Sequence, residues 1–532
     1  MKRQLVAIID CGTSSVRCVV FDINTGEKLC APSKDWYVPE SKDNAGFYDF
    51  DDVINWKLLC ECTQSAMSKI NKDELICVTS TGFRHGIFGT AKDSNQVIFG
   101  SFNMDSRCDN MYLRNNGFEQ DVFDIGGDWS NLHGISRLLW FKNNEPETFE
   151  KIGKFMFVSD WVTYKLSDEI AVEPGNASSS LLMDVVKREW SDYLREKCGF
   201  SRDIYPNLVD AGTCIGEVTK AAAEQTGLPA GLKVVCGVAD TQAGLVGVGA
   251  TKPGTSAVVG GSYWLDCYIT DHPRVDPLHQ TRLSSHSVKN QWVYEGLGFY
   301  VGLTVRWFRD AFGQQEKWIE QTYGVDSFYL LNKLAEPVPP GSYGLQVLFA
   351  DVADQSDLRM CAPTFMGWDV LHPNRSHKGV FFRAILENAC YQAYGEYQKI
   401  SRILDDATIP DQVLLTGGAA KSRLWAQILA DVLQRPVQLT KETEGTCLGA
   451  AIHAAAGLGV YSSIEDGIAN LVSAGDLIEP NVKNREVYMN EYHRWRELYK
   501  NGLGLLERGL VRSMYQADGS YTDEQLRNPW KL

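Results

Sequence analysis

The sequence has no apolar stretch that approaches the length of about 18 residues needed to cross a membrane. The apolar run that opens the chain ends at Asp10 after five residues, so we expect no signal peptide. No Cys-x-x-Cys pair and no His-Glu-x-x-His motif occurs among the 14 cysteines and nine histidines. These absences argue against structural zinc and favour a cytoplasmic protein with reduced thiols.

Basic residues are also scarce, with 52 Lys and Arg against 67 Asp and Glu and a net charge of −15. Such an acidic chain is a poor binder of nucleic acids and anionic membranes, so we expect neither as a partner. Neither Gly-x₄-Gly-Lys-Ser/Thr nor a Gly-x-Gly-x-x-Gly after a strand is present, which excludes the P-loop and Rossmann classes. Any phosphate site must therefore be a local pocket of N–H groups and a few basic side chains.

The first informative stretch is an opening hairpin, with buried-type strands expected over 5–9 and 16–23. Asp10 ends the first strand and suits a magnesium ion or its waters. The turn offers hydroxyl and N–H donors to a phosphate, and Arg17 adds positive charge. Taken alone, the stretch fits an ordinary polar hairpin equally well. The donors in the turn are Thr13, Ser14 and Ser15.

A second hairpin of the same plan occupies residues 255–267, with Gly261 and Ser262 at its tip. Two such hairpins in one chain indicate a duplicated ribonuclease-H-like domain that binds a nucleotide between its halves. We expect residues 1–250 to form one half and residues 251–532 the other.

Two further strands end in turns that suit ligand binding, because α/β folds place their ligands at such strand ends. Asp240 follows the strand 234–236 and has no basic neighbour in sequence. Gly417 and Gly418 follow the strand 413–415, and a helix is expected from Ser422. Paired glycines let the backbone lie against a phosphate or a planar ligand.

Other polar residues are weaker candidates, since each has a plain structural interpretation. Arg84 and His85 follow the strand 75–80, and Asp105 follows an expected strand at 97–104, where it could simply pair with Arg107. Residues 173–180 read as a polar loop. Periodicity predicts helices over 50–70, 131–141, 155–166, 243–248, 295–312 and 384–404.

In order along the chain, DCGTSSVR, GVADTQAGLVG, VVGGSYW, RWFRDAF and LLTGGAAKSRLWAQILAD resemble the FGGY carbohydrate kinases. That family belongs to the sugar kinase, Hsp70 and actin superfamily. The resemblance covers nearly the whole chain. It implies an α/β fold of two ribonuclease-H-like domains with a nucleotide cleft between them, and an enzyme that uses ATP and Mg²⁺ to phosphorylate a small polyol or ketose.

Within the family, RLLWF, VSDWVTYKLS, GLTVRWFRDAF and VPPGSYG resemble the autoinducer-2 kinases, which phosphorylate 4,5-dihydroxy-2,3-pentanedione. Those kinases have Arg-Glu where this chain has Arg84-His85, and a histidine there is reminiscent of xylulose kinases. A kinase for xylulose or another ketopentose is therefore the alternative.

The family pattern implies a role for each matching residue. Asp240 would be the general base, and Asp10 would hold Mg²⁺. Arg306 stands where glycerol kinases have glutamine. The residues implied to bind ATP are Thr13, Ser14, Ser15, Arg17, Gly261, Ser262, Gly302, Arg306, Gly417, Gly418 and Ser422, and those on the substrate side are Arg84, His85, Asp105, Thr241 and Gln242.

Two other classes share this fold. A non-catalytic sugar sensor would lose the base, and the presence of Asp240 and Asp10 speaks against it. An Hsp70- or actin-like ATPase would carry peptide-binding or polymer-forming elements, and the sequence has no such extra domain. A homodimer is compatible with the resemblance.

Overall fold

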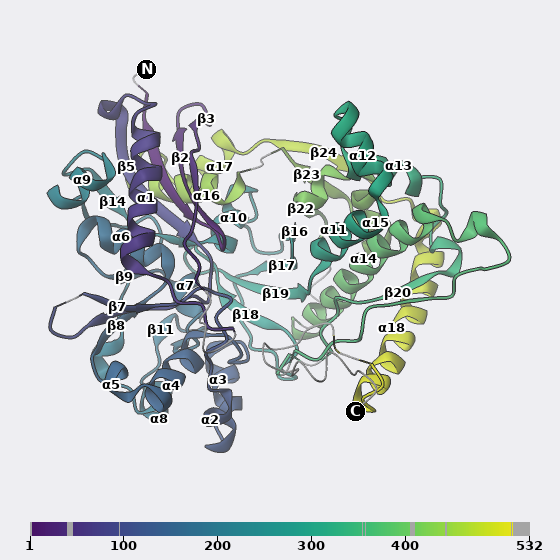
Figure 1. Ribbon diagram of the computed structural model, residues 1–532, viewed down its shortest axis with the longest axis horizontal. Helices are drawn as coiled ribbons and strands as arrows, with labels where there is room; N and C mark the ends of the chain where they lie inside the picture. The colour runs from purple at the N-terminus through teal and green to yellow at the C-terminus, as the bar shows by residue number, and fades with distance from the viewer. Residues whose placement is uncertain are drawn as a thin grey trace.

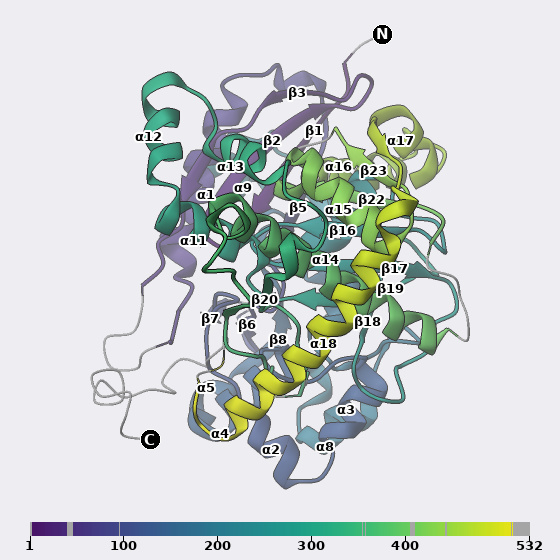
Figure 2. The same ribbon diagram turned by 90° about the vertical axis from the view of Figure 1, so that its right-hand side faces the viewer.

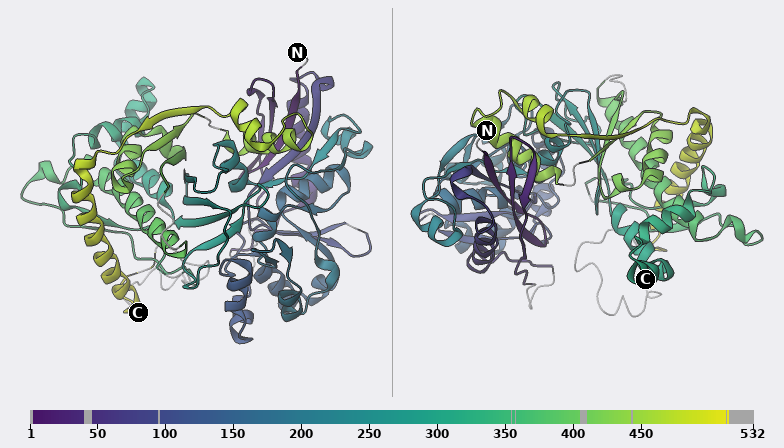
Figure 3. Two further views of the ribbon diagram at one scale, coloured as in Figure 1. Left: turned by 180° about the vertical axis from the view of Figure 1, so that it is seen from behind. Right: turned by 90° about the horizontal axis from the view of Figure 1, so that it is seen from above.

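The computed structural model describes residues 3–39, 46–94, 96–353, 355–356, 358–404, 410–441, 444–511 and 513. Two helix-covered β-sheets lie side by side as two domains (Figure 1), and the view from above separates the two lobes clearly (Figure 3). This arrangement confirms the predicted α/β fold with two domains. Within the described residues, no helix is long and apolar enough to span a bilayer.

The first sheet has the strand order β13-β14-β5-β1-β2-β3. Every residue of β1 is buried, as expected of a central strand, and β1 pairs antiparallel with β2 and parallel with β5. Short strands β15 and β4 join β5 and β2. The strands are β1 (Leu5–Cys11), β2 (Ser15–Asp22), β3 (Glu27–Cys30), β4 (Ser33–Asp35), β5 (Leu75–Gly82), β13 (Cys214–Glu217), β14 (Lys233–Val235) and β15 (Val238–Ala239).

Helices cover both faces of this sheet, and a smaller lobe extends below it (Figure 1). The covering helices are α1 (Asp52–Met67), α6 (Val158–Ser167), α9 (Lys220–Thr226), α10 (Asp240–Gly247), α16 (Gly445–Gly457) and α17 (Ile464–Leu471). The lobe contains β6 (Phe88–Ala91), β7 (Val97–Gly100), β8 (Ile152–Met156), β9 (Ala171–Val172), β10 (Met183–Asp184), β11 (Glu189–Trp190), β12 (Asn207–Leu208), α2 (Asn110–Asn115), α3 (Glu119–Gly126), α4 (Gly134–Asn144), α5 (Pro146–Phe149), α7 (Pro174–Ser178) and α8 (Asp192–Cys198).

The second sheet repeats the plan of the first, with the order β18-β19-β17-β16-β22-β23-β24. Helix α18 runs diagonally across the outer side of this domain (Figure 2). The elements are β16 (Ser256–Gly260), β17 (Trp264–Thr270), β18 (Arg282–Ser285), β19 (Trp292–Gly298), β20 (Gln346–Leu348), β21 (Thr364–Met366), β22 (Val413–Gly417), β23 (Val437–Thr440), β24 (Ala474–Ile478), α11 (Val301–Phe312), α12 (Gln314–Tyr323), α13 (Ser327–Ala335), α14 (Lys378–Ile403), α15 (Arg423–Leu433) and α18 (Arg485–Glu507).

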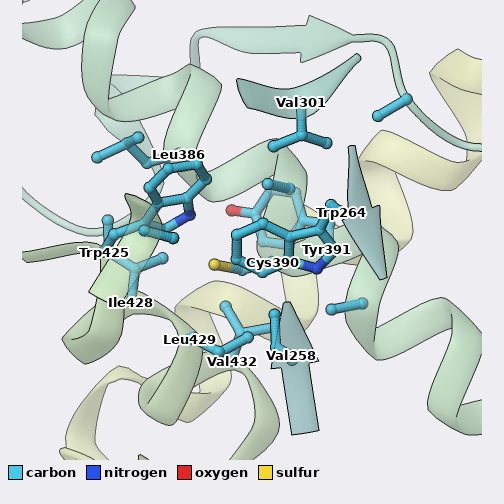
Figure 4. Close-up of a cluster of buried hydrophobic side chains, with 14 of the residues drawn as sticks. Val258, Trp264, Val301, Leu386, Cys390, Tyr391, Trp425, Ile428, Leu429 and Val432 are labelled. Carbon is cyan, nitrogen blue, oxygen red and sulfur yellow. The ribbon is translucent and has the colours of Figure 1, made fainter. Parts of the chain in front are cut away.

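The core of the second domain anchors the β16–β17 hairpin directly beside its tip, where Trp264 pairs with Gly260. The Trp264 ring, at the start of β17, stacks on Trp425 of α15 with centroids 5.0 Å apart. Val258, Leu429 and Val432 close the same cluster (Figure 4). Burying two tryptophans together stabilises the site strongly, because each removes a large apolar area from water. The hairpin tip therefore stands on a rigid base.

Helices α10 and α16 cross at very close range and join the two halves. A methyl group built on Gly449 would lie 1.8 Å from the Ala243 carbonyl oxygen, and one on Gly247 would lie 1.8 Å from the Gly445 carbonyl oxygen. Side chains of α16 also pack with Val6 and other residues of the first sheet. Helix α16 follows β23 of the second sheet in the chain but packs on the first domain.

Several local predictions differ from the structure, and three of them bear on the site. Residues Phe155 and Met156 belong to β8, and the helix starts at Val158. The segment 295–298 belongs to β19, because it pairs with β17 and β18, so the predicted helix begins only at Val301. Residues 173–180, predicted as loop, contain the short helix α7, whose first turn is capped by the carboxylate of Glu173.

Candidate active site

A cavity of about 640 Å³ lies between the two domains. The starts of α10 and α16 form one side, and the β16–β17 hairpin and the end of β22 form the other. A cavity of this size accommodates a nucleotide-sized ligand. Its lining includes Asp240, Thr241, Gly244, Gly261, Ser262, Thr416, Gly417, Gly418, Lys421, Thr440, Lys441, Gly445 and Thr446.

Two glycine turns reach this cavity from neighbouring strands. In the parallel pair β16–β22, Gly260 lies opposite Gly417, so both turns leave the sheet at the same edge. Gly417 has φ of +78°, and a side chain there would lie 2.7 Å from the Gly260 carbonyl oxygen. Only glycine fits this position without strain. The sequence-predicted residues Gly261 and Gly418 are thereby brought together in one wall of the cavity.

The opening hairpin presents its polar tip at the surface of the first domain. Thr13 and Ser14 are exposed and Ser15 is half-buried. The Asn103 amide donates to the Thr13 hydroxyl oxygen at 3.0 Å. Asp10 is buried at the end of β1. None of these residues is in the lining of the 640 Å³ cavity.

Arg17 links the hairpin to the rim of the cavity. Its guanidinium donates to Asp10 through Nε (3.1 Å) and Nη2, and to Glu444 through Nη1 (2.8 Å). Lys28 reaches the other oxygen of Glu444 at 2.9 Å. Because Glu444 immediately precedes α16, these bonds tie β2 and β3 to the start of that helix. Arg17 is thus engaged by two carboxylates, where the sequence predicted a phosphate contact.

Asp240 is the first residue of α10, and its half-buried side chain lines the cavity. The Thr241 backbone N–H donates to its Oδ1 at 2.7 Å. Burial raises the pKa of Asp240 above its ordinary value, although the Arg84 charge opposes this rise; the Asp10 carboxylate adds to it. A carboxylate with a raised pKa accepts a proton more readily, which suits a general base.

Arg84 lies between the domains, held by a buried carboxylate. Its Nη1 and Nη2 donate to the two oxygens of Glu295 at 2.8 and 2.9 Å. The Ser284 hydroxyl donates to the same carboxylate at 2.7 Å, and the Gln242 amide lies 3.4 Å from it. The sequence-predicted residues Arg84 and Gln242 are therefore brought together, while Thr241 faces the larger cavity.

His85 borders a second, much smaller cavity of about 10 Å³, lined also by Arg84, Asp128, His133 and Arg282. Its ring is 4.6 Å from that of His133, and its buried Nδ1 has no hydrogen-bond partner among the residues that the structure describes. Burial lowers the pKa of His85 well below its ordinary value, and neighbouring cations lower it further. His85 is therefore neutral near pH 7, and the cavity has room for about one water molecule.

Asp105 is completely buried and serves as an anchor for its surroundings. Its carboxylate accepts bonds from the Tyr48 backbone N–H (2.7 Å), from Arg107 and from Arg137 (3.2 Å). It lines neither of the two cavities described above. Its bond to Arg107 matches the simpler interpretation, and a role on the substrate side stays a prediction.

Three other predicted nucleotide residues surround the site less directly. Gly302 backs onto the hairpin tip, since a methyl group there would lie 2.0 Å from the Gly261 carbonyl oxygen. Ser422 caps α15 by accepting from the Trp425 N–H at 3.1 Å and donates to Asn332. Arg306 is exposed on α11 and does not line the 640 Å³ cavity.

Sequence reasoning missed several residues of the site. Lys421 and Lys441 supply the basic side chains that an acidic protein needs for a polyphosphate, and Lys421 stood within a motif already noted. Glu295 was assigned to a helix, although a lone carboxylate in an apolar and aromatic stretch was a usable signal. Asp128 and His133 lie on one segment and Arg282 on a distant one, so no local signal in the sequence links them.

The fold and the cavity define a two-domain α/β protein with a nucleotide-sized cavity between its domains. The family models of the FGGY carbohydrate kinases match residues 5–247 for the N-terminal domain and 250–458 for the C-terminal domain. This chain belongs to the FGGY family of carbohydrate kinases, which are phosphotransferases with an alcohol group as acceptor.

Two curated relatives named autoinducer-2 kinase, from Yersinia enterocolitica and Yersinia pseudotuberculosis, are each 35% identical to the chain over 518 residues, covering 96% of it and 97% of the relative. Solved structures share the fold. Xylulose kinase from Rhodospirillum rubrum has a TM-score of 0.82 at 24% identity, covering 95% of this chain and 100% of its own. Plasmodium falciparum glycerol kinase with ADP has a TM-score of 0.79 at 16% identity, covering 93% and 98%.

Proposed function

We propose that this kinase transfers the γ-phosphate of ATP to the terminal hydroxyl of an autoinducer-2-type five-carbon diketone, 4,5-dihydroxy-2,3-pentanedione. The identity of 35% to autoinducer-2 kinases over almost the whole chain carries the choice of substrate. A panel of acceptors, assayed by ADP release, tests it. If the pentanedione is ignored while xylulose or another ketose is phosphorylated, the substrate assignment is wrong and the kinase assignment remains.

In the proposed reaction, Asp240 accepts the proton of the attacking hydroxyl, a contribution worth roughly 10²–10⁴-fold. The 640 Å³ cavity would hold ATP, with Lys421 and Lys441 and the glycine turns around its phosphates. The glycerol kinase of the same fold was solved with ADP, which supports an adenine nucleotide as the phosphate donor. Thr13, Ser14 and Ser15 would meet the terminal phosphates from the first domain.

The residues present also fit a magnesium ion. Both bonds from Arg17 end on Oδ2 of Asp10, so Oδ1 can face an ion or its waters. Mg²⁺ commonly takes one or two carboxylates together with phosphates and waters, and the charge of Asp10 acts on Asp240 nearby. Bound Mg²⁺ would neutralise phosphate charge. We place it at Asp10.

The nucleotide assignment predicts the effect of a bulky residue at Gly418. A methyl group there would lie 3.6 Å from its nearest neighbour, so Gly418→Leu should fold. The leucine would enter the cavity, and we expect KM for ATP to rise about tenfold or more while KM for the acceptor changes little. Gly504→Leu, on open space of α18, is the matched control. If calorimetry shows an unchanged affinity for ATP, then ATP does not bind against the wall of the cavity that contains Gly418.

If His85 lies on the substrate side, its substitution should change the order in which the enzyme prefers its acceptor substrates. A neutral imidazole offers one donor and one acceptor, whereas a carboxylate offers only acceptors. Arg84 and Arg282 surround the site with positive charge, which a glutamate would complement. We expect His85→Glu to reorder acceptors by kcat/KM, because buried hydrogen bonds can discriminate by orders of magnitude. His85→Gln, of equal length and no charge, separates charge from shape; identical rankings in all three proteins would place His85 outside the pocket.

A ketopentose kinase is the second candidate, because His85 is buried and neutral where related kinases of the pentanedione class have glutamate. The cytoplasm is the proposed compartment. The described cysteines are all free thiols, which fits a reducing environment.

A further inference from the structure

Two buried ion pairs cross the domain boundary in opposite directions. Arg84 of the first domain pairs with Glu295 of the second at 2.8 Å, and Arg282 of the second domain pairs with Asp128 of the first at 3.0 Å. Arg282 is also 3.6 Å from Glu295, so the four side chains form one connected cluster. The side chain of Glu295 is 0% exposed and that of Arg84 is 9% exposed. Pairs this well buried are rigid and only weakly screened by salt.

Glu295 is fully ionised within this cluster. Burial alone would raise its pKa, but Arg84, Arg282 and the Ser284 hydroxyl lower it to about 2. The forked geometry uses one N–H from each terminal nitrogen of Arg84. A guanidinium carries five N–H groups, so three remain for other partners. The orientation of Arg84 is thus set by a residue of the opposite domain.

Arg84 also has a competing carboxylate within reach of its charge. In the parallel pair β15–β5, Ala239 lies opposite Gly82, so Asp240 and Arg84 follow neighbouring strands at the same edge of the sheet. The Arg84 charge acts to lower the pKa of Asp240, and the Asp10 carboxylate acts to raise it. A guanidinium without another partner would pair with Asp240 directly, because a close pair in a dry site is strongly attractive. Such a pair would occupy the base and make it a weaker proton acceptor.

We propose that Glu295 is a positioning residue that holds Arg84 away from Asp240 and aims its remaining N–H groups at the acceptor. Because Glu295 belongs to the second domain and Arg84 to the first, this arrangement exists only while the two domains are apposed. The base is therefore left free in the assembled cleft. The catalytic part of the inference rests on the proposed function, in which Asp240 is the base.

The test compares Glu295→Gln, Arg84→Gln and the double variant in a double-mutant cycle. In Glu295→Gln we expect kcat/KM for the acceptor to fall about 100-fold or more, because Arg84 would no longer be correctly placed against the acceptor. KM for ATP should stay within about threefold of the wild-type value. Without the Glu295 carboxylate, Arg84 can approach Asp240 and stabilise its ionised form, which lowers the pKa of Asp240. The acid limb of the pH profile should therefore move to lower pH. The double variant should be no worse than Arg84→Gln alone. Glu295→Asp, which keeps the charge, should recover part of the activity.

Glu387→Gln is the matched control for a merely structural role. It removes the carboxylate of another buried ion pair, with Arg383 at 2.9 Å on α14, away from the cleft. It should lower Tm without moving the pH profile. If Glu295→Gln also lowers only Tm, or if its effect adds in full to that of Arg84→Gln, the inference is wrong.

The proposed function can fail separately. A wild-type enzyme that phosphorylates none of the acceptors refutes the proposed function. The pH profile of acceptor-independent ATP hydrolysis then still reports the ionisation of Asp240. An unchanged acid limb in Glu295→Gln overturns the inference in that assay, and a shift to lower pH supports it.

Discussion

Asp240→Asn is expected to lower kcat by at least about 100-fold, with the affinity for ATP nearly unchanged. The amide has the shape of the carboxylate but cannot accept the hydroxyl proton. Because burial raises the pKa of Asp240, ionising this group is costly in the folded state. The neutral amide should therefore leave Tm equal or slightly higher. The measurements are steady-state kinetics, calorimetry with ATP and thermal unfolding.

Asp266→Asn provides the control for this prediction. Asp266 is another buried carboxylate with a raised pKa, but it lies on β17 and lines neither of the two cavities of the site. Its amide variant should keep kcat within about threefold, since it touches no reacting group. Near-normal turnover in Asp240→Asn would show that Asp240 is not the general base.

Gly449→Ala is expected to destabilise the protein by more than about 3 kcal/mol, because overpacking against a fixed backbone forces two helices apart. The added methyl group would lie 1.8 Å from the Ala243 carbonyl oxygen. Asp240 starts α10, and Gly445 and Thr446 start α16, so separating the helices should also widen the cavity and lower kcat. Thermal unfolding and kinetics on the folded fraction measure both effects.

Gly244→Ala is the matched control on the same pair of helices. A methyl group on Gly244 would lie 3.4 Å from the Thr446 hydroxyl oxygen, which is an ordinary contact with a side chain. Alanine is also the better helix former, so Tm should stay the same or rise. A Gly449→Ala protein as stable as Gly244→Ala would contradict the close crossing of α10 and α16.

The sequence predicted the glycine turns and the acid best, because their signals are local. Gly417 and Gly418 follow one strand, and Asp240, with no basic neighbour in sequence, follows another. Such turns at strand ends can be recognised from the residue types of a few neighbouring positions. The same local reasoning misread residues 295–298. An apolar stretch beside Val301 continues a helical pattern, and only pairing with β17 and β18 makes it a strand.

The partners of charged side chains could not be predicted in this way. Arg17 looked free for a phosphate, yet Glu444, more than 400 residues away, lies beside it in the fold. Asp105 could be matched with Arg107 from the sequence, but its contacts with Tyr48 and Arg137 could not be predicted. Electrostatic pairing depends on distance in space, which sequence separation does not give.

By itself, the sequence determined the α/β class, the duplicated hairpins, the position of Asp240 at a strand end and membership of a kinase family. These features depend on residue type and spacing along the chain. The tertiary structure alone decided that α16 packs on the first domain, that Glu295 holds Arg84 and that His85 is a buried neutral group. Each of these depends on burial and on contacts between distant segments, and burial sets both the ionisation of a side chain and the partner that it must find.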